Sequence, residues 1–151
     1  MFILDSDHLS ILQRQAPTAE FRVLADRMAG HPSSDFFVTI VSFHEQVNGW
    51  RAFVARAKDS AGLVRGYAEL EGILSDFARA QVLPFSTAAA HIYDDLRKGR
   101  IRVGPMDLRI ASIAIAHRMT VLTRNTVDFE RVPNLLIEDW TRRENDTFGI
   151  S

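Results

Sequence analysis

Cysteine is absent from the 151-residue chain, which excludes disulfide bonds and thiolate metal sites. The five histidines include no pair at the spacing of zinc ligands, so carboxylate, amide or water oxygens would have to carry most of a metal site. No apolar run approaches the roughly 18 residues of a membrane-spanning helix. The first residues also lack the charged segment and cleavage site of a secretory signal. We therefore expect a cytoplasmic protein that has no membrane partner.

An excess of charge of one sign is also missing. The formal net charge is −1, so no overall field attracts nucleic acid, although a local basic patch stays open. Hydrophobic residues make up 46% of the chain and charged residues 25%, as in ordinary globular proteins. The length suits one domain. We expect this domain to cover residues 1–140 and a loosely ordered polar tail to follow over 141–151.

Short apolar runs alternate with helical patterns along the chain. Strands are expected in FIL (2–4), DFFVTIV (35–41), VLPF (82–85), TVLT (120–123) and NLLIED (134–139). Helices are expected from about residue 8 and over residues 17–30, 42–57, 59–80, 86–99 and 106–119. This alternation predicts a three-layer α/β/α fold, in which helices cover both faces of a short-stranded, mainly parallel central sheet.

Polar side chains stand where this fold is otherwise apolar. Asp5 ends the first strand, Glu45 follows the second, and Asp107 opens the most apolar helix. Asn125 and Asp128 follow the fourth strand. Ligands of parallel sheets bind at the carboxyl ends of the strands, so these residues should face one crevice. Clustered carboxylates repel one another unless they are protonated or neutralised. Oxygen ligands of this kind suit Mg²⁺, with Mn²⁺ as a substitute.

Each acid also has a structural interpretation. Asp5 at a strand end can be a turn or capping residue, and Ser6 or Asp7 can cap the first helix. Ser42 and Glu45 match a capping box, in which the glutamate bonds the backbone of the serine. Asp107 lies in a first helical turn, where the helix dipole favours an anion. These structural roles explain the residues one at a time, whereas a metal site explains why they converge.

Four segments resemble, in order, the motif regions of PIN-domain ribonucleases, and especially the VapC-like toxins of bacterial toxin–antitoxin pairs. They are FILDSDHLS, VSFHE, GPMDLRIASIAIAHRMTVLTRN and DFERVPNLLIEDW, and the resemblance spans residues 1 to about 140. It implies a PIN-like fold and a metal-dependent endoribonuclease that a cognate antitoxin holds inactive. It also implies a homodimer.

The resemblance assigns roles to individual residues. Asp5, Glu45 and Asp107 match the three leading acids of the family and would be metal ligands and catalytic residues. Asn125 takes the fourth position, where the all-acidic version carries another acid. Its amide oxygen can bind Mg²⁺ or a water but adds no charge, and Asp128 could assist through a water. A metal-activated water attacking in line would leave a 5′-phosphate and a 3′-hydroxyl.

Basic residues lie next to these acids in the sequence. The segment RKGRIR directly precedes the helix of Asp107, and another arginine lies beside Asn125. A solvated loop is one interpretation, and we favour contacts to RNA phosphates near an acidic pocket. Arg109 could serve RNA or face the protein. The predicted RNA-binding residues are Arg97, Lys98, Arg100, Arg102 and Arg124.

Two other functions remain open from the sequence. Asp5 and Asp7 after an apolar strand mimic the opening motif of haloacid-dehalogenase-like phosphatases, although Leu9 replaces the expected Thr or Val. The two lysines, Lys58 and Lys98, do not follow a strand and turn as that family's phosphate-binding lysine does. The second alternative is a catalytically weak PIN-like module that only binds a partner. Retention of the three leading acids argues against it.

Overall fold

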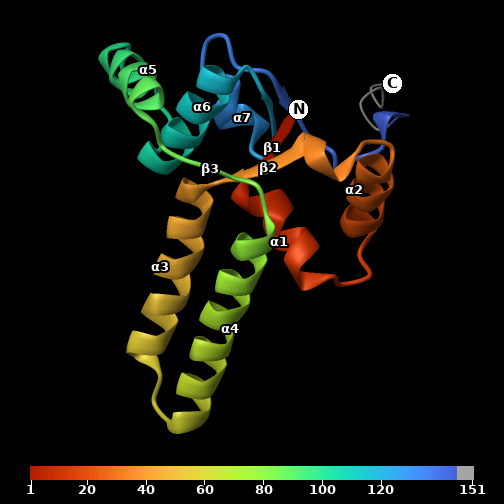
Figure 1. The fold of residues 1–151 in the computed structure, drawn as a ribbon, viewed down its shortest axis with the longest axis vertical. Helices are drawn as coiled ribbons and strands as arrows, with labels where there is room; N and C mark the ends of the chain where they lie inside the picture. Colours follow the sequence, from red (N-terminus) through yellow and green to blue (C-terminus); the bar gives the residue numbers. More distant parts are fainter. Residues whose placement is uncertain (146–151) are drawn as a thin grey trace.

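Five short strands form the centre of the computed structural model, which describes residues 1–145 (Figure 1). They are β1 (Phe2–Leu4), β2 (Phe36–Thr39), β3 (Val82–Leu83), β4 (Thr120–Leu122) and β5 (Ile137–Glu138). Their order in the sheet is β3-β2-β1-β4-β5, and all neighbours run parallel. The prediction of a short-stranded parallel sheet is confirmed. The chain reverses its direction of travel across the sheet between β1 and β4, which makes this pair the topological switch point.

Helices surround this sheet in the order that the sequence pattern predicted. They are α1 (Ser6–Arg14), α2 (Ala19–Ala29), α3 (Ile40–Arg56), α4 (Ser60–Arg79), α5 (Thr87–Lys98), α6 (Pro105–His117) and the short α7 (Thr126–Phe129), with a 3₁₀ turn at Ser33–Asp35. Figure 1 shows α5 and α6 on one side of the sheet and α1 and α2 on the other. The three-layer α/β/α arrangement is therefore confirmed.

Successive residues of the central strands face two separate hydrophobic cores, as the pleat of a strand requires. Ile3 and Val121 belong to the core that α5 and α6 cover. Leu4 and Leu122 belong to the core of α1, α2 and α4. Both cores end at the carboxyl edge of the sheet, so a side chain that follows β1 or β4 is partly shielded from water.

Two helix starts differ from the prediction. The second strand ends at Thr39 rather than at residue 41, because the Thr39 side chain accepts a hydrogen bond from the Ser42 backbone at 3.2 Å and caps α3. Ser42 therefore lies inside the helix, and the predicted capping box of Ser42 and Glu45 is wrong. The first helix begins at Ser6, and its cap is Asp5 rather than Ser6 or Asp7.

The packed body of the protein continues beyond the predicted domain limit at residue 140. Trp140 is buried in the core of α1 and α2. Thr141, which we assigned to the polar tail, is buried too and donates through its backbone and its hydroxyl to Asp139. The rest of the predicted tail is described as far as residue 145, and residues 146–151 lie outside the described part of the chain.

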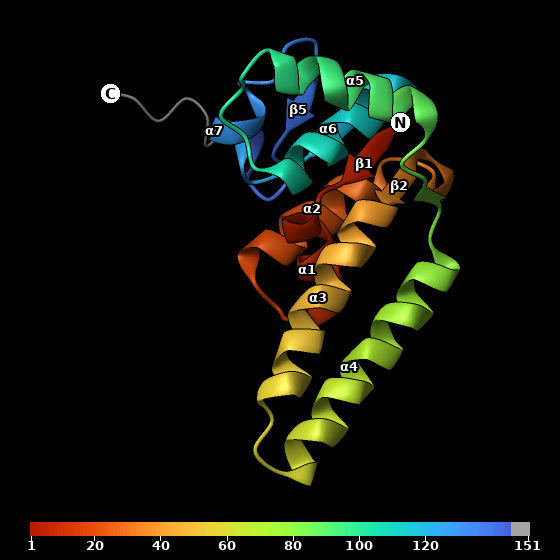
Figure 2. The same ribbon diagram turned by 90° about the vertical axis from the view of Figure 1, so that its left-hand side faces the viewer.

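Helices α3 and α4 form a long hairpin that projects away from the sheet (Figures 1 and 2). Gly66 of α4 is buried at the point where the two helices approach each other. A Cβ at this position would lie 2.5 Å from Val54 Cγ2 and 3.1 Å from Phe53 Cδ1. The missing side chain therefore sets how closely the hairpin packs. Within residues 1–145, no helix has the length and apolarity needed to cross a bilayer.

Gly66→Ala should destabilise the protein by roughly 1–3 kcal/mol, because the added methyl forces α3 and α4 apart. Gly72 lies on the same helix with open space around it, so Gly72→Ala is the matched control. This control should gain about 0.5–1 kcal/mol from the better helix propensity of alanine. Urea denaturation of both variants measures the difference. Equal stability of the two would show that the hairpin does not depend on close packing at Gly66.

Candidate active site

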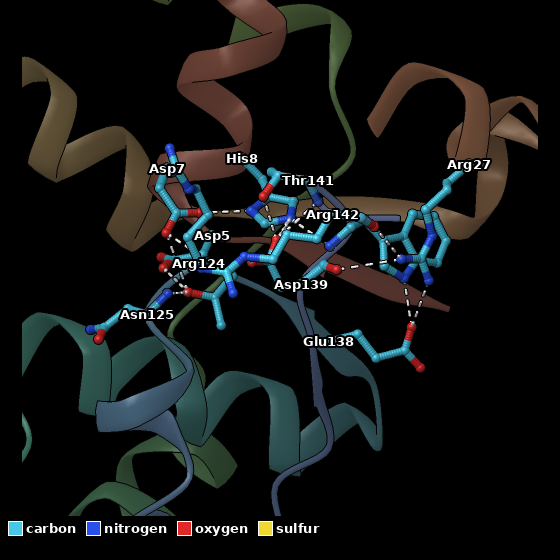
Figure 3. Close-up of polar contacts among 12 residues, drawn as sticks. Asp5, Asp7, His8, Arg27, Arg124, Asn125, Glu138, Asp139, Thr141 and Arg142 are labelled. Carbon is cyan, nitrogen blue, oxygen red and sulfur yellow. Dashed lines mark hydrogen bonds and ion pairs between the residues drawn. The ribbon is translucent and has the colours of Figure 1, made fainter. Parts of the chain in front are cut away.

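The predicted acids gather at the carboxyl ends of β1 and β4, at the switch point of the sheet. Asp5 directly follows β1, and Asn125 lies in the turn after β4. Glu45 comes from the second turn of α3, and Asp107 comes from the first turn of α6. Figure 3 shows Asp5 close to Asn125, with β1 and the turn after β4 side by side. The predicted convergence on one edge is therefore present in the fold.

Asp5 is the most buried of these acids, with 6% of the residue exposed. Its carboxylate accepts hydrogen bonds from the Ser6 backbone at 2.7 Å and from the Thr123 hydroxyl at 2.9 Å. Burial raises the pKa of Asp5 to about 7, and the neighbouring charge of Asp7 adds to this effect despite the two hydrogen bonds. The cap of α1 is therefore a carboxylate whose ionisation the fold disfavours.

Glu45 points at the first turn of α1 instead of capping its own helix. The Ser6 hydroxyl oxygen lies 3.1 Å from Glu45 Oε1 and 3.1 Å from the Ser42 hydroxyl. Burial raises the pKa of Glu45, and the charge of Asp107 raises it further. Because Thr39 already caps α3, the structure leaves Glu45 without a role in helix capping.

Asp107 is held by the turn that follows β4. Burial raises the pKa of Asp107, and the charge of Asp128 raises it as well. The Asn125 side-chain nitrogen donates to Asp107 Oδ2 at 3.3 Å and to Asp128 Oδ2 at 3.1 Å. Asn125 thus lies between the carboxylates of Asp107 and Asp128 and donates to both through its side-chain nitrogen. To act as a metal ligand, this amide would have to turn its oxygen toward Asp107.

Two further residues beside the acids were not singled out by the sequence. Arg131 donates from one guanidinium nitrogen to Asp128 Oδ1 at 3.3 Å and to the Arg102 carbonyl at 2.9 Å. It ties the basic loop before α6 to the turn after β4. His8 is fully buried and lies 2.7 Å from Asp7 through Nδ1 (Figure 3). The contacts of Asp7 with His8 and of Asp128 with Arg131 join near neighbours in the sequence, whereas the contact of Arg131 with Arg102 joins residues 29 positions apart and only the fold shows it.

Asp7 differs from the other acids of the site because its charge is compensated. Burial alone would raise the pKa of Asp7, but the hydrogen bonds from His8 and from the Arg124 backbone outweigh burial and lower it. The carboxyl groups of Asp5, Glu45 and Asp107 have the opposite shift. The site therefore combines one carboxylate whose pKa is lowered by its hydrogen bonds with three whose pKa values are raised.

The donor set suits a hard divalent cation. Mg²⁺ and Mn²⁺ prefer carboxylate and amide oxygens. Burial, and to a smaller extent repulsion between the acids, raises the pKa values of Asp5, Glu45 and Asp107, and a bound cation would offset both effects. Within residues 1–145, no three His, Asp or Glu side chains already surround a single metal position. The residues present therefore fit a cation by charge and chemistry, and their side chains would have to close around it.

The predicted RNA-binding residues all lie at the surface, and they stay a prediction. The side chain of Lys98 is 80% exposed and lies 4.0 Å from Asp95, while the Arg97 guanidinium packs over the ring of Tyr93. Arg109 instead faces the protein, because its guanidinium packs over Tyr93 and contacts the sulfur of Met106. The remaining exposed arginines of the prediction are Arg100, Arg102 and Arg124.

Comparison with known proteins gives a match between residues 4–135 and a family model described as the PIN domain. Ribonuclease VapC2 of Rickettsia felis is 40% identical over 70 residues, or 43% of this chain and 52% of that protein. The tRNA(fMet)-specific endonuclease VapC of Salmonella typhimurium is 38% identical over 88 residues, or 56% of this chain and 64% of that protein. The chain thus spans about half to two-thirds of these curated relatives.

A solved structure extends the likeness over nearly the whole fold. The crystal structure of DNA-bound VapBC from Salmonella typhimurium matches with a TM-score of 0.69 and 27% identity, over 92% of this chain and 97% of that one. The phosphatase alternative receives no such support. Lys98, one of the two lysines that it could use, is exposed at the end of α5.

Glu45→Gln separates a metal ligand from a helix cap. We expect the variant to lose more than about tenfold in Mn²⁺ affinity by calorimetry, because it removes a charge from the cluster. Its thermal stability without metal should be unchanged or higher. Thr39→Ala, the matched change at the actual cap, should cost about 1 kcal/mol of stability and leave the acids in place. Wild-type Mn²⁺ affinity in Glu45→Gln would remove Glu45 from the metal site.

Asp5→Asn should stabilise the metal-free protein in a pH-dependent way. The pKa of Asp5 is raised to about 7 in the folded state, above its usual 3.8. Ionisation therefore favours unfolding, with no cost below pH 4, a growing cost between pH 4 and 7, and the full cost at pH 8.

At pH 8 the free energy of unfolding of the variant should exceed that of wild type by about 2 kcal/mol. Each unit of pKa shift is worth roughly 1.4 kcal/mol, and a lost hydrogen bond offsets part of the gain. Near pH 4 the gain should be lost and the variant should be less stable than wild type, because only the cost of the lost hydrogen bond then remains. Urea denaturation in EDTA measures it, with Asp94→Asn at an exposed carboxylate of α5 as the control. A gain that is the same at both pH values would contradict the raised pKa.

Proposed function

The chain belongs to the PIN-domain family, and we propose that it is a metal-dependent endoribonuclease, the toxin component of a toxin–antitoxin pair. The observation that carries this proposal is the convergence of Asp5, Glu45 and Asp107, each with a raised pKa, at the switch point of a parallel sheet. Perturbed carboxylates grouped at one edge are a mark of functional sites. Two curated relatives are named as a ribonuclease and as a tRNA(fMet)-specific endonuclease, which supports RNA as the substrate.

The residues of this site would have two roles in phosphodiester hydrolysis, binding of the cation and acceptance of a proton. Asp5, Glu45 and Asp107 would hold Mg²⁺, or Mn²⁺ in its place, with the amide of Asn125 as a weaker ligand. The bound cation would supply positive charge against the carboxylates and the phosphate under attack. Glu45 and Asp107 are only partly buried, so either can reach an incoming water. Either carboxylate, ionised beside the cation, would be able to accept the proton of the attacking water.

Water attacking the phosphorus in line with the leaving oxygen would give a 5′-phosphate and a 3′-hydroxyl. Asp5 is anchored by Ser6 and Thr123, so it is better suited to fixed ligation than to proton transfer. The exposed arginines before α6 would bind the phosphates that flank the cleaved bond. Arg131 fixes the backbone of that loop at Arg102, so the basic loop and the acids would bind one RNA strand together.

We propose that the partner is a cognate antitoxin and that it binds the projecting hairpin. Helix α4 exposes Leu63, Val64, Tyr67 and Leu74, with 60% of Tyr67 and 65% of Leu74 open to solvent. A cleft of about 810 Å³ between α1, α3 and α4 lies on another face of the hairpin, where Arg65, Glu69 and Asp76 line it rather than these apolar side chains. Exposed apolar side chains in such a group favour burial by a protein partner. A homodimer and a cytoplasmic location belong to the same proposal.

Ribonuclease assays with the purified protein test the function. Wild type should cleave RNA in Mg²⁺ or Mn²⁺ and stop in EDTA, with tRNA(fMet) among the substrates offered. Asp107→Asn should lose at least about 100-fold in rate while keeping or raising the melting temperature, because it removes a like charge from the cluster. Glu71→Gln, an exposed change on α4, should retain wild-type cleavage.

The products should carry 5′-phosphates, which a 5′-phosphate-dependent exonuclease would digest. Cleavage that persists in EDTA or in Asp107→Asn would overturn the metal-dependent mechanism. Specific binding of RNA or antitoxin by a wild-type protein that cleaves no RNA would favour the non-catalytic PIN-like module.

A further inference from the structure

His8 is the one fully buried histidine in the described chain, and the fold determines which of its ring nitrogens carries the proton. The Trp140 backbone N–H donates to His8 Nε2 at 3.2 Å, whereas Asp139 Oδ1 lies 3.7 Å from the same nitrogen, beyond hydrogen-bond distance. In the neutral ring Nε2 therefore accepts and carries no proton. The proton of the neutral ring is therefore on Nδ1. Nδ1 lies 2.7 Å from Asp7 Oδ1 and donates to it. The contact to Trp140, near the end of β5, thus selects the tautomer that can bind Asp7.

Asp7, which His8 orients, in turn contacts the residues of the turn after β4. Its second oxygen, Oδ2, accepts the Arg124 backbone N–H at 2.9 Å and lies 3.4 Å from the Thr123 hydroxyl. Both oxygens of Asp7 therefore have protein donors, which hold the carboxylate in one orientation. Figure 3 shows Asp7 between His8 on one side and Arg124 on the other. These hydrogen bonds explain why the pKa of Asp7 is lowered, whereas the pKa values of Asp5, Glu45 and Asp107 are raised.

Residues of the turn after β4 form hydrogen bonds with two proposed metal ligands, Asp5 and Asp107. The Thr123 hydroxyl donates to Asp5 Oδ2 at 2.9 Å and accepts the Asn125 backbone N–H at 3.0 Å. Asn125 in turn donates to Asp107. A shift of this turn would therefore move the partners of Asp5 and Asp107 together.

We propose that His8 is a positioning residue that acts through Asp7 to hold the Thr123–Asn125 turn in place, so that Asp5 and Asp107 are preorganised for the divalent cation. The inference rests on the proposed metal-dependent function and adds to it a buried residue outside the ligand set. Partners that orient metal ligands are worth about 10–100-fold in metal affinity when they are removed. His8 would act one step further out, through the hydrogen bonds of Asp7.

Two substitutions of similar size each remove one of the two hydrogen bonds of His8, those with Asp7 and with Trp140. Asn places its amide nitrogen near the position of Nδ1, so His8→Asn can still donate to Asp7 but loses the acceptor for Trp140. Gln is one methylene longer and can accept from Trp140, but His8→Gln loses the donor to Asp7. Each variant removes one buried hydrogen bond, so a purely structural role predicts equal effects.

Calorimetric titration with Mn²⁺ and no RNA should show His8→Asn within about threefold of wild type and His8→Gln weaker by about 10–100-fold. The rate of RNA cleavage should follow the same order. In long-range ¹⁵N–¹H NMR spectra of the metal-free wild type, the His8 proton should be on Nδ1. A proton on Nε2, or equal Mn²⁺ affinities of the two variants, would overturn the proposal, and the NMR result decides if His8→Gln does not fold.

Failure of the proposed function would look different. Wild-type protein that binds Mn²⁺ with the expected ranking of variants but cleaves no RNA would support the positioning role and refute the ribonuclease. RNA cleavage by the wild type together with equal Mn²⁺ affinities of His8→Asn and His8→Gln would support the ribonuclease and refute the positioning role of His8.

Discussion

Repulsion among partly buried carboxylates at one edge of the sheet is the constraint to which the rest of this structure responds. Asp5, Glu45 and Asp107 come from three separate elements, and burial together with a neighbouring acid raises the pKa of each. Such a cluster lowers stability unless the surrounding fold is firm enough to hold it. The two hydrophobic cores on either face of the sheet supply that support, and both reach the strand ends from which Asp5 and the turn after β4 emerge.

The protein distinguishes acids that it compensates from acids that it leaves open. Asp7 has His8 and the Arg124 backbone, and Asp128 has Arg131. These acids hold loops in place. The pKa values of Asp5, Glu45 and Asp107 are raised despite their hydroxyl, backbone N–H and amide donors. A cation bound at this edge would offset that cost of ionisation.

The hairpin of α3 and α4 belongs to a different part of the function. Its packing depends on the close approach of the two helices at Gly66, whereas its outer surface leaves large apolar side chains on α4 in solvent. Glu45 lies near the start of α3, where the hairpin leaves the sheet. A protein that bound the hairpin would therefore also contact the helix that carries Glu45, which gives such a protein a physical route to the acidic edge of the sheet.

Local pattern was enough to predict the sheet, the helix order and the acids at its edge, because alternation of short strands with helices leaves few topologies and strand ends meet at one side. Asp5 could be recognised for the same reason, since it ends an apolar strand. The choice between Thr39 and Ser42 as the helix cap could not be predicted. Both residue types cap helices, and Ile40 and Val41 suit a strand as well as a buried helical turn.

Contacts between distant segments decided the remaining features. His8 and Trp140 are 132 positions apart, so no spacing rule could show that one selects the tautomer of the other. The orientation of Asn125 depends on Asp107 and Asp128 at once, and Arg131 joins two loops through a backbone carbonyl. A sequence determines which groups can form hydrogen bonds, but a hydrogen bond requires donor and acceptor within about 3 Å, and only the folded chain brings these groups that close.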